Sequence, residues 1–323
     1  MSTRPRIAIL DDYQNLAFRM ADWSALRERC EVQIFDQHLS EEDAAIALQD
    51  FDAICLLRER MAVPRSLIER LPRLKFIAIT GHLHRTLDMV AAGERGIIVS
   101  AAPRGGQGGW ATAELSWGLL IALARHIPQE ANAMRAGGWQ NSYGTAIGGR
   151  TLGLLGLGRL GTYMVPIAKA FGMRVLAWSQ NLTEAAATAA GAEYVSKDEL
   201  FRQSDFVSVH LVLSERTHHI VGARELSLMK PSASIINTSR GPLIDTEALM
   251  VALRGQHIAG AALDTFDVEP LPDDDPLRSL PNVILTPHLG YTVEDLLREF
   301  YARTVENVGA WLDGAPLRVI GPH

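Results

Sequence analysis

The chain has 323 residues, of which 47% are hydrophobic and 21% are charged, and its formal net charge is −6. This length predicts two domains, each large enough to bury its own core. The mild negative charge argues against a nucleic-acid-binding surface. Cys30 and Cys55 are too few for a disulfide framework or a thiolate zinc site, which favours a cytoplasmic protein with reduced thiols. No apolar stretch approaches the ~18 residues of a membrane span, and the first one, from Ile7 to Leu10, is far too short for a signal peptide.

Short apolar runs rich in Val and Ile alternate with helical patterns along the whole chain. Continuous apolar strands between helices indicate a parallel sheet that is buried on both faces. The predicted class is therefore α/β, built from βαβ units. The predicted strands are Arg6–Leu10, Val32–Phe35, Ala53–Leu57, Lys75–Thr80, Ile97–Ala101, Thr151–Leu155, Arg174–Trp178, Phe206–Leu211, Ser234–Asn237, Ile258–Leu263 and Val283–Thr286.

Two segments interrupt this alternation. Residues 103–109 hold four glycines and predict a hinge or loop, because glycine-rich sequence does not hold regular structure. Residues 287–290 precede an apolar stripe that predicts a last helix. Thr292 and Asp295 have the spacing of a capping box at the start of that helix, and Gly314 is expected to end it.

A glycine motif stands between a predicted strand and a predicted helix. Gly156, Gly158 and Gly161 fit G-x-G-x-x-G, in which the first glycine permits a tight turn and the second lets backbone approach a pyrophosphate. The third lets the helix pack closely against the strand. Backbone N–H groups at the helix start, those of Arg159 and Leu160, would then face the phosphates. The motif in this context predicts dinucleotide binding.

The type of dinucleotide is left open by the next strand end. An acidic residue usually stands about 20 positions past the glycines and binds the adenosine ribose. Here that place is held by Ser179, which is followed by Gln180. Neither side chain repels or attracts a 2′-phosphate, so the sequence allows NAD or NADP.

Charged residues follow three further predicted strands at their carboxyl ends. In chain order they are Arg240, then Asp264 with Glu269, then His288. Ligands of open α/β sheets bind at the carboxyl ends of the strands. We therefore expect these side chains at an active site next to the dinucleotide.

The motifs and their order resemble the D-isomer-specific 2-hydroxyacid dehydrogenases, over nearly the whole length and most closely in the cofactor half. The resemblance implies a Rossmann cofactor domain, with a doubly wound parallel sheet, at residues 104–288. This domain is expected to be inserted in a smaller, discontinuous, flavodoxin-like substrate domain at residues 1–103 and 289–323. The resemblance also implies a homodimer through the cofactor domains.

The resemblance implies roles for the charged residues. Arg240 would hold the substrate carboxylate and polarise the 2-oxo group, and His288 would be the general acid in reduction and the general base in oxidation. Glu269 would pair with His288 and orient its ring. Formate dehydrogenases of the superfamily carry Gln at the place of Glu269, so the carboxylate favours a 2-oxo acid. The further expected cofactor contacts are Thr112, His210, Thr238, Asp264 and His288.

The substrate half resembles the family less closely. The family presents backbone N–H groups to the substrate carboxylate from the loop that here reads Gly81, His82, Leu83, and then His84. Leu83 and His84 depart from the residues common at these places. We expect Arg58, Gly81, His82 and Leu83 to line the substrate pocket together with Arg240 and His288.

The leading interpretation is an NAD(P)-dependent oxidoreductase that interconverts a small 2-oxo acid and a D-2-hydroxy acid. The alternative from another class is an NAD(H)-sensing regulatory protein of the corepressor type on the same fold. A short-chain dehydrogenase would need Tyr-x-x-x-Lys, but Tyr163 and Lys169 are six positions apart. No metal is expected, because the histidine pairs lack Cys or acidic neighbours at ligand spacing.

Overall fold

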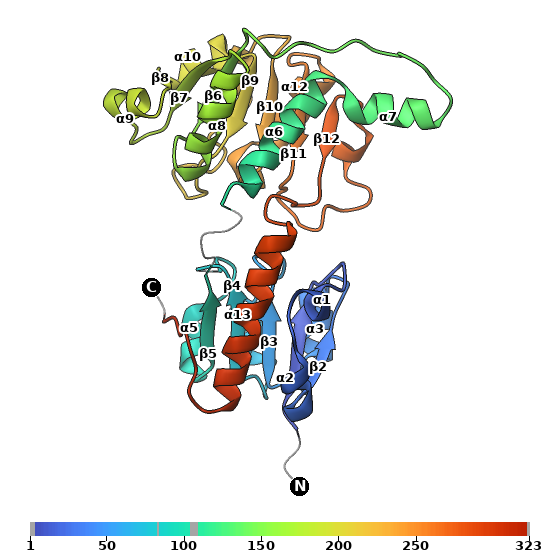
Figure 1. Cartoon of the computed structure of the whole chain (residues 1–323), viewed down its shortest axis with the longest axis vertical. Coiled ribbons are helices and arrows are strands. Elements are labelled where there is room, and N and C mark those ends of the chain that lie inside the picture. Colours follow the sequence, from blue (N-terminus) through green and yellow to red (C-terminus); the bar gives the residue numbers. More distant parts are fainter. Residues whose placement is uncertain (1–3, 83, 104–108, 322–323) are drawn as a thin grey trace. The chain divides into compact units, whose positions relative to one another are not determined.

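The computed structural model describes residues 4–82, 84–103 and 109–321, and it divides the chain into two compact units (Figure 1). Unit 1 comprises residues 1–108 and 293–323, and unit 2 comprises residues 109–292. The divisions predicted from the sequence were residues 104 and 289. Leu83, a predicted substrate contact, lies outside the described residues.

Unit 1 is built on a five-stranded parallel sheet with the strand order β2-β1-β3-β4-β5. Its strands are β1 (Arg6–Leu10), β2 (Glu31–Ile34), β3 (Ala53–Leu56), β4 (Phe76–Thr80) and β5 (Ile98–Ala102). The order 2-1-3-4-5 is the flavodoxin-like, doubly wound order, in which ligands bind where the order reverses, between β1 and β3.

Helices cover both faces of this sheet. They are α1 (Ala17–Met20), α2 (Ser24–Arg29), α3 (Glu41–Ala47), α4 (Arg65–Glu69), α5 (Met89–Glu94) and α13 (Glu294–Leu312). Ile77 packs in one core with α3, α4 and α5. Its neighbour Phe76 points to the opposite face, because side chains alternate along a strand. There it stacks on Trp311 of α13, with ring centroids 5.1 Å apart.

Unit 2 is built on a seven-stranded parallel sheet with the order β12-β11-β10-β9-β6-β7-β8. Its strands are β6 (Thr151–Leu155), β7 (Arg174–Trp178), β8 (Glu193–Tyr194), β9 (Phe206–Val209), β10 (Ser234–Asn237), β11 (Gly260–Leu263) and β12 (Val283–Leu285). From β8 to β11 this is the Rossmann order 3-2-1-4-5-6, which reverses between β6 and β9. The fold class predicted from the sequence is confirmed.

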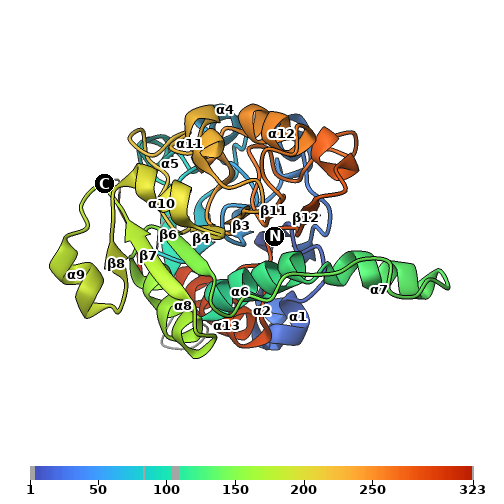
Figure 2. The same cartoon turned by 90° about the horizontal axis from the view of Figure 1, so that it is seen from above.

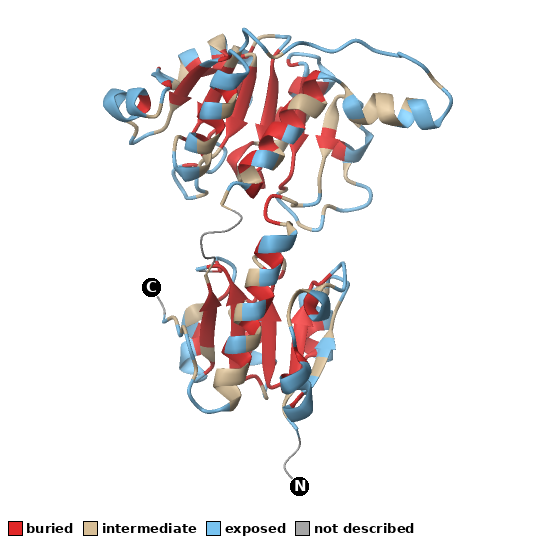
Figure 3. Ribbon diagram, viewed as in Figure 1, coloured by how far each residue is buried: buried red, intermediate tan, exposed pale blue. Residues whose placement is uncertain are grey.

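The helices of unit 2 form a layer on each side of its sheet. They are α6 (Ala111–Ala124), α7 (Ile127–Arg135), α8 (Arg159–Ala170), α9 (Glu184–Ala189), α10 (Lys197–Gln203), α11 (Ala223–Leu228) and α12 (Thr246–Arg254), with the short 3-10 helices η1 (Gly241–Leu243) and η2 (Pro276–Ser279). One core joins α6 and α8 to the sheet, and a second core joins α10, α11 and α12 to its other face. In Figure 3 the central strands of this sheet are accordingly red through most of their length. Helix α7 has no buried residue and extends away from the body of unit 2 (Figures 1 and 2).

The capping box predicted at Thr292 and Asp295 is wrong. Helix α13 begins at Glu294 and its N-cap is Val293, which is extended and has no side-chain capping bond. Thr292 therefore lies one residue outside the cap, where its hydroxyl cannot serve the first turn. In the described part of the chain, we find no helix that is long and apolar enough to cross a membrane.

Candidate active site

The three glycines after β6 form a loop with two tight contacts and one open position. Gly156 has φ +108°, and a Cβ there would lie 2.8 Å from the carbonyl carbon of His210, just past β9. A Cβ on Gly161 would collide with the carbonyl oxygen of Gly156. Gly158, the N-cap of α8, is exposed and has no atom within 4 Å of a Cβ. The loop thus leaves backbone open in front of α8, which fits a dinucleotide phosphate.

Other predicted cofactor contacts surround this loop. The ring Nε2 of His210 lies 2.9 Å from the hydroxyl of Ser208, while its buried Nδ1 has no partner among the described residues. Burial lowers the pKa of His210 to about 4, so the ring is neutral at pH 7. Ser179 and Gln180 follow β7, the first half-buried and the second exposed.

A hydrogen-bonded histidine–carboxylate pair joins the segments that follow β11 and β12. Nδ1 of His288 lies 2.6 Å from Oε2 of Glu269, and Oε1 of the same carboxylate accepts a bond from the backbone N–H of Phe266 at 2.9 Å. Both carboxylate oxygens are therefore fixed. The side chain of His288 is 21% exposed, which leaves the ring accessible to a small molecule. The ring of Tyr291 packs edge-to-face against the imidazole, with the two ring centroids 5.5 Å apart.

A buried carboxylate holds the backbone around His288. Asp264, fully buried after β11, accepts bonds from the hydroxyl of Thr286 at 2.6 Å and from the N–H groups of Leu289 and Gly290 at 2.7 and 2.9 Å. The pKa of Asp264 is raised because of its burial. The three hydrogen bonds favour the ionised form and act in the opposite direction, but burial has the larger effect. His288 has φ +53°, a left-handed conformation that non-glycine residues rarely adopt and that surrounding bonds must maintain.

Two threonines predicted to face the cofactor are tied to this framework. The hydroxyl of Thr112, on α6, donates to the carbonyl of Gly290 at 2.7 Å. The hydroxyl of Thr238 lies 2.7 Å from that of Ser116, also on α6. Helix α6 is thereby bonded to the loops that follow β10 and β12.

Arg240 lies on a tightly bonded loop after β10. Asn237 donates to the carbonyl of Arg240 at 2.8 Å and accepts from the N–H of Ser239 at 3.0 Å, which closes a turn. At the next position a Cβ on Gly241 would collide with the backbone of Phe266. The loop that carries Arg240 and the loop that carries Glu269 are thus in backbone contact.

The predicted substrate residues of unit 1 lie at the carboxyl ends of β3 and β4. The N–H of Arg58 donates to the hydroxyl of Thr80 at 2.6 Å, and the Arg58 guanidinium lies where a Cβ of Gly81 would be. The N–H of Gly81 donates to the carbonyl of Ala102 at 2.8 Å, so it is already used. His82 is exposed, whereas His84 is buried, and burial lowers the pKa of His84 to about 4.

A polar group at the same edge of unit 1 is missing from the sequence predictions. Asp11, directly after β1, is buried with φ +55°, and its Oδ1 accepts from the hydroxyl of Tyr13 at 3.1 Å. The same oxygen lies 3.0 Å from Nδ1 of His38, and this hydrogen bond raises the pKa of His38. Arg60 donates to the carbonyl of Asp11 at 2.6 Å and lies over the Tyr13 ring. The sequence feature that could have indicated this group is the acidic pair Asp11-Asp12, which comes immediately after a predicted strand.

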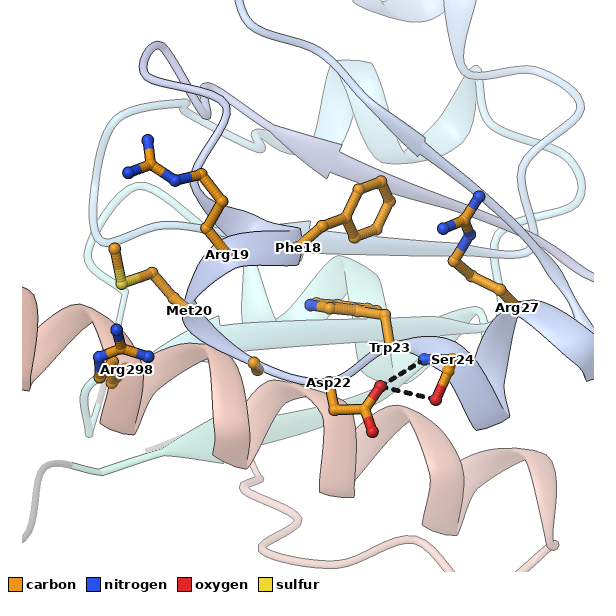
Figure 4. A pocket seen from close by; sticks show the side chains of 9 residues that line it. Phe18, Arg19, Met20, Asp22, Trp23, Ser24, Arg27 and Arg298 are labelled. Atoms are coloured by element: carbon orange, nitrogen blue, oxygen red, sulfur yellow. Dashed lines mark hydrogen bonds between the residues drawn. The ribbon is translucent and has the colours of Figure 1, made fainter.

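Unit 1 also has a cavity of about 500 Å³ between α1, α2 and the start of α13 (Figure 4). Phe18 and Trp23 meet edge-to-face there, and Arg27 lies over the Phe18 ring. The Asp22 carboxylate accepts hydrogen bonds from the backbone N–H and the hydroxyl of Ser24. No predicted site residue lines this cavity.

Comparison with known proteins identifies one family. The family model described as "D-isomer specific 2-hydroxyacid dehydrogenase, NAD binding domain" matches residues 117–290. The glyoxylate reductase of Thermococcus litoralis is 38% identical over 261 residues, which are 78% of this chain and 78% of that protein. The D-3-phosphoglycerate dehydrogenase of Methanocaldococcus jannaschii is 40% identical over 260 residues, but these span 80% of this chain and only 49% of that protein.

Solved structures extend the similarity to both units. The phosphoglycerate oxidoreductase of Vibrio cholerae o395 has a TM-score of 0.90 and 34% identity, covering 96% of this chain and 100% of that one. The apo D-lactate dehydrogenase of Escherichia coli has a TM-score of 0.81 and 28% identity, covering 98% and 99%. The chain belongs to the D-isomer-specific 2-hydroxyacid dehydrogenase family, which confirms the resemblance seen in the sequence. Unit 2 contains the NAD-binding domain of that family, and its cofactor is NAD or NADP.

Proposed function

We propose that the chain is an NAD(P)-dependent oxidoreductase that interconverts a small 2-oxo acid and a D-2-hydroxy acid. The observation that supports this most directly is the 2.6 Å contact between His288 and Glu269 at a strand end of the NAD-binding unit. Relatives named glyoxylate reductase and hydroxypyruvate reductase support the substrate class.

His288 and Glu269 act together on the proton in this proposal. In reduction the imidazolium of His288 gives a proton to the oxygen of the 2-oxo group, and in oxidation the neutral ring takes it back. Glu269 accepts from Nδ1, so that Nε2 is directed to substrate, and its charge stabilises the imidazolium. When bound, the dinucleotide supplies or takes up the hydride.

Arg240 holds the substrate by its carboxylate. A guanidinium makes two parallel hydrogen bonds to a carboxylate, and its charge also polarises the neighbouring carbonyl. In unit 1 we propose Arg58 and the backbone of the loop from Gly81 through Leu83 as further carboxylate contacts. Because the N–H of Gly81 already donates to the carbonyl of Ala102, the proposed donor in the described part of this loop is the amide of His82.

The dinucleotide would be held by the loop after β6 and by the strand ends beside it. The backbone of Gly156, Gly158, Arg159, Leu160 and Gly161 would bind the pyrophosphate. The other proposed contacts are Thr112, Ser179, Gln180, His210, Thr238, Asp264 and His288. A neutral Ser179 gives no charge-based selection between NAD and NADP.

The deciding experiment follows NADH and NADPH oxidation by the purified protein with glyoxylate, hydroxypyruvate, pyruvate, branched oxo acids and phenylpyruvate. We expect turnover with at least one substrate, and a loss of about 1,000-fold or more in kcat/KM in Arg240→Ala and in His288→Ala. Near-wild-type activity in either variant would contradict the role that we propose for that residue. Cofactor binding without turnover on any substrate would favour the NAD(H)-sensing protein instead.

We also propose a homodimer formed through unit 2. The support on this chain is α7 and the segment after it, which present Ile127, Met134, Trp139 and Tyr143 to solvent. Side chains of this size on one projecting segment are typical of a protein–protein contact.

A further inference from the structure

Unit 2 contains a second cavity, of about 330 Å³, next to the loops that carry Arg240 and Glu269. This volume suits a small molecule. Apolar side chains from α12, β11, η2 and the residue after η1 form most of its wall, among them Ile244, Leu249, Met250, Leu263 and Leu277. The wall is therefore suited to an apolar ligand body.

Apart from the amide of Asn237, which is bonded within its own loop, the polar side chains that line this cavity can accept hydrogen bonds. Thr265 is 2% exposed, and its buried hydroxyl has no hydrogen-bond partner among the described residues. Three carboxylates, those of Glu247, Asp267 and Asp275, also line the cavity, and its lining includes no Lys, Arg or His. Thr246 donates to one oxygen of Asp267, so the other oxygen is not used by that bond. A cation with N–H donors matches this set of groups.

The neighbouring cation does not neutralise the three carboxylates. Arg278 follows the wall residue Leu277, and its guanidinium donates to the carbonyls of Leu271 and Pro272 at 2.6 and 2.7 Å. Its nearest carboxylate contact is with Asp273, at 3.9 Å. The negative charge of the cavity lining is thus not paired by this arginine.

The wall of the cavity is part of the framework of the acid–base pair. Phe266 lines the cavity, and its N–H holds Oε1 of Glu269 at 2.9 Å. Gly241, the residue that follows Arg240, also lines the cavity, and it packs against the backbone of Phe266. The backbone of Phe266 thus connects the cavity wall to Glu269 and, through Glu269, to the ring of His288.

We propose that this cavity binds a small primary amine with an apolar body and that its occupation repositions the Glu269–His288 pair. The ammonium group bonds the acidic side chains and the apolar body fills the space between α12 and η2. The hydroxyl of Thr265 accepts one of the N–H bonds. Such a ligand regulates proton transfer without entering the cofactor or substrate site.

The test uses isoamylamine, with isoamyl alcohol as a neutral probe of the same shape and isovalerate as an anionic probe of similar size. Binding is followed by calorimetry and by NMR on the wild-type protein, without cofactor or substrate. We expect isoamylamine to bind with a millimolar Kd, ~5-fold more tightly than the alcohol, and isovalerate not to bind. The ring resonances of His288 should shift as the amine saturates. Equal binding of amine and alcohol, or unmoved His288 resonances at saturation, would overturn the proposal.

Variants on α12 separate this cavity from other amine sites. Met250→Trp fills the cavity and should weaken amine binding by about 10-fold. Val251→Trp, at the adjacent position where the side chain is 65% exposed, should bind like the wild type. Thr265→Val keeps the side-chain shape and should weaken binding by about 3-fold. Undiminished binding in a folded Met250→Trp places the amine elsewhere and rejects the site, whatever the outcome of the oxo-acid assays.

Discussion

The three glycines of the cofactor loop differ in what a side chain would meet. At Gly156 and Gly161 a methyl group would strike backbone of the protein itself, whereas at Gly158 it would meet nothing within 4 Å. The motif was visible in the sequence because its spacing is local. The contact at Gly156 involves the backbone of His210, which is 54 residues further along the chain, and so needed the structure.

This difference predicts opposite behaviour of two alanine variants. Gly158→Ala should leave the free energy of unfolding within about 0.5 kcal/mol of the wild type, because its surroundings are open. It should nevertheless raise the Kd for NADH about 10-fold or more, because the methyl group occupies the approach to the phosphates. Gly156→Ala should cost about 2 kcal/mol of stability, because of its φ of +108° and its backbone contact. Denaturation and NADH titration measure both; unchanged NADH binding in Gly158→Ala would contradict the binding role.

Groups of polar residues that come together from separate chain segments were harder to predict from the sequence. Arg58 is predicted from its place at a strand end, whereas the predictions from the sequence do not include the group formed by Asp11, Tyr13, His38 and Arg60. These four come from three segments that meet only where β1, β2 and β3 end side by side. No spacing within one segment shows that meeting.

The buried His84 predicts a pH-dependent stability. Its pKa is lowered to about 4 by burial, from 6.5 for an ordinary histidine. Between these values the unfolded chain binds a proton that the folded chain does not, so the free energy of unfolding falls as the pH falls. The contribution is fully present above pH 6.5 and decreases by about 3 kcal/mol by pH 4.

Two glutamine variants check this effect by urea denaturation across the same pH range. His84→Gln removes the titrating ring, so its stability should fall less steeply with acid than that of the wild type. His82→Gln changes an exposed neighbour and should keep the wild-type slope. A wild-type slope in His84→Gln would show that another group controls the acid sensitivity.

At the scale of elements, the buried strands were predictable and the exposed pieces were not. Arg6–Leu10, Thr151–Leu155, Arg174–Trp178 and Ser234–Asn237 have the bounds predicted, because continuous burial leaves a continuous apolar run. Strand β8 was missed, since its two residues are both exposed at the sheet edge. The start of α13 was misplaced because Thr292, a common capping residue type, lies just outside the helix.

The segment after β12 is an element whose shape depends on one carboxylate. Asp264→Asn keeps the size of the side chain but replaces one accepting oxygen by an N–H₂ group, which faces donors. We expect the free energy of unfolding to fall by about 2–3 kcal/mol and the ring resonances of His288 to shift, because the N–H of either Leu289 or Gly290 loses its acceptor. Thr286→Ser retains the hydroxyl donor and serves as the matched control. Wild-type stability in Asp264→Asn would show that these bonds do not hold the segment.

At the scale of the whole molecule, the projecting segment of unit 2 has no partner within the described chain that would bury it. Helix α7 has no buried residue, and Trp139 and Tyr143 beyond it are 72% and 93% exposed. Exposing this much aromatic surface is unfavourable in water unless another surface covers it. The proposed cover is a second copy of the chain.

The double variant Trp139→Ser/Tyr143→Ser tests this. We expect the wild type to elute at twice the monomer mass in light scattering, and the double variant to have a dimer Kd raised by about 100-fold or more, because aromatic residues dominate interface energies. Val212→Ser removes an apolar side chain of unit 2 that is 66% exposed but lies elsewhere in the chain, and it should remain dimeric. A double variant that stays dimeric at low micromolar concentration would assign the contact to another surface. A monomeric double variant with unchanged NADH binding would show that the segment serves assembly and that the cofactor loop folds without it.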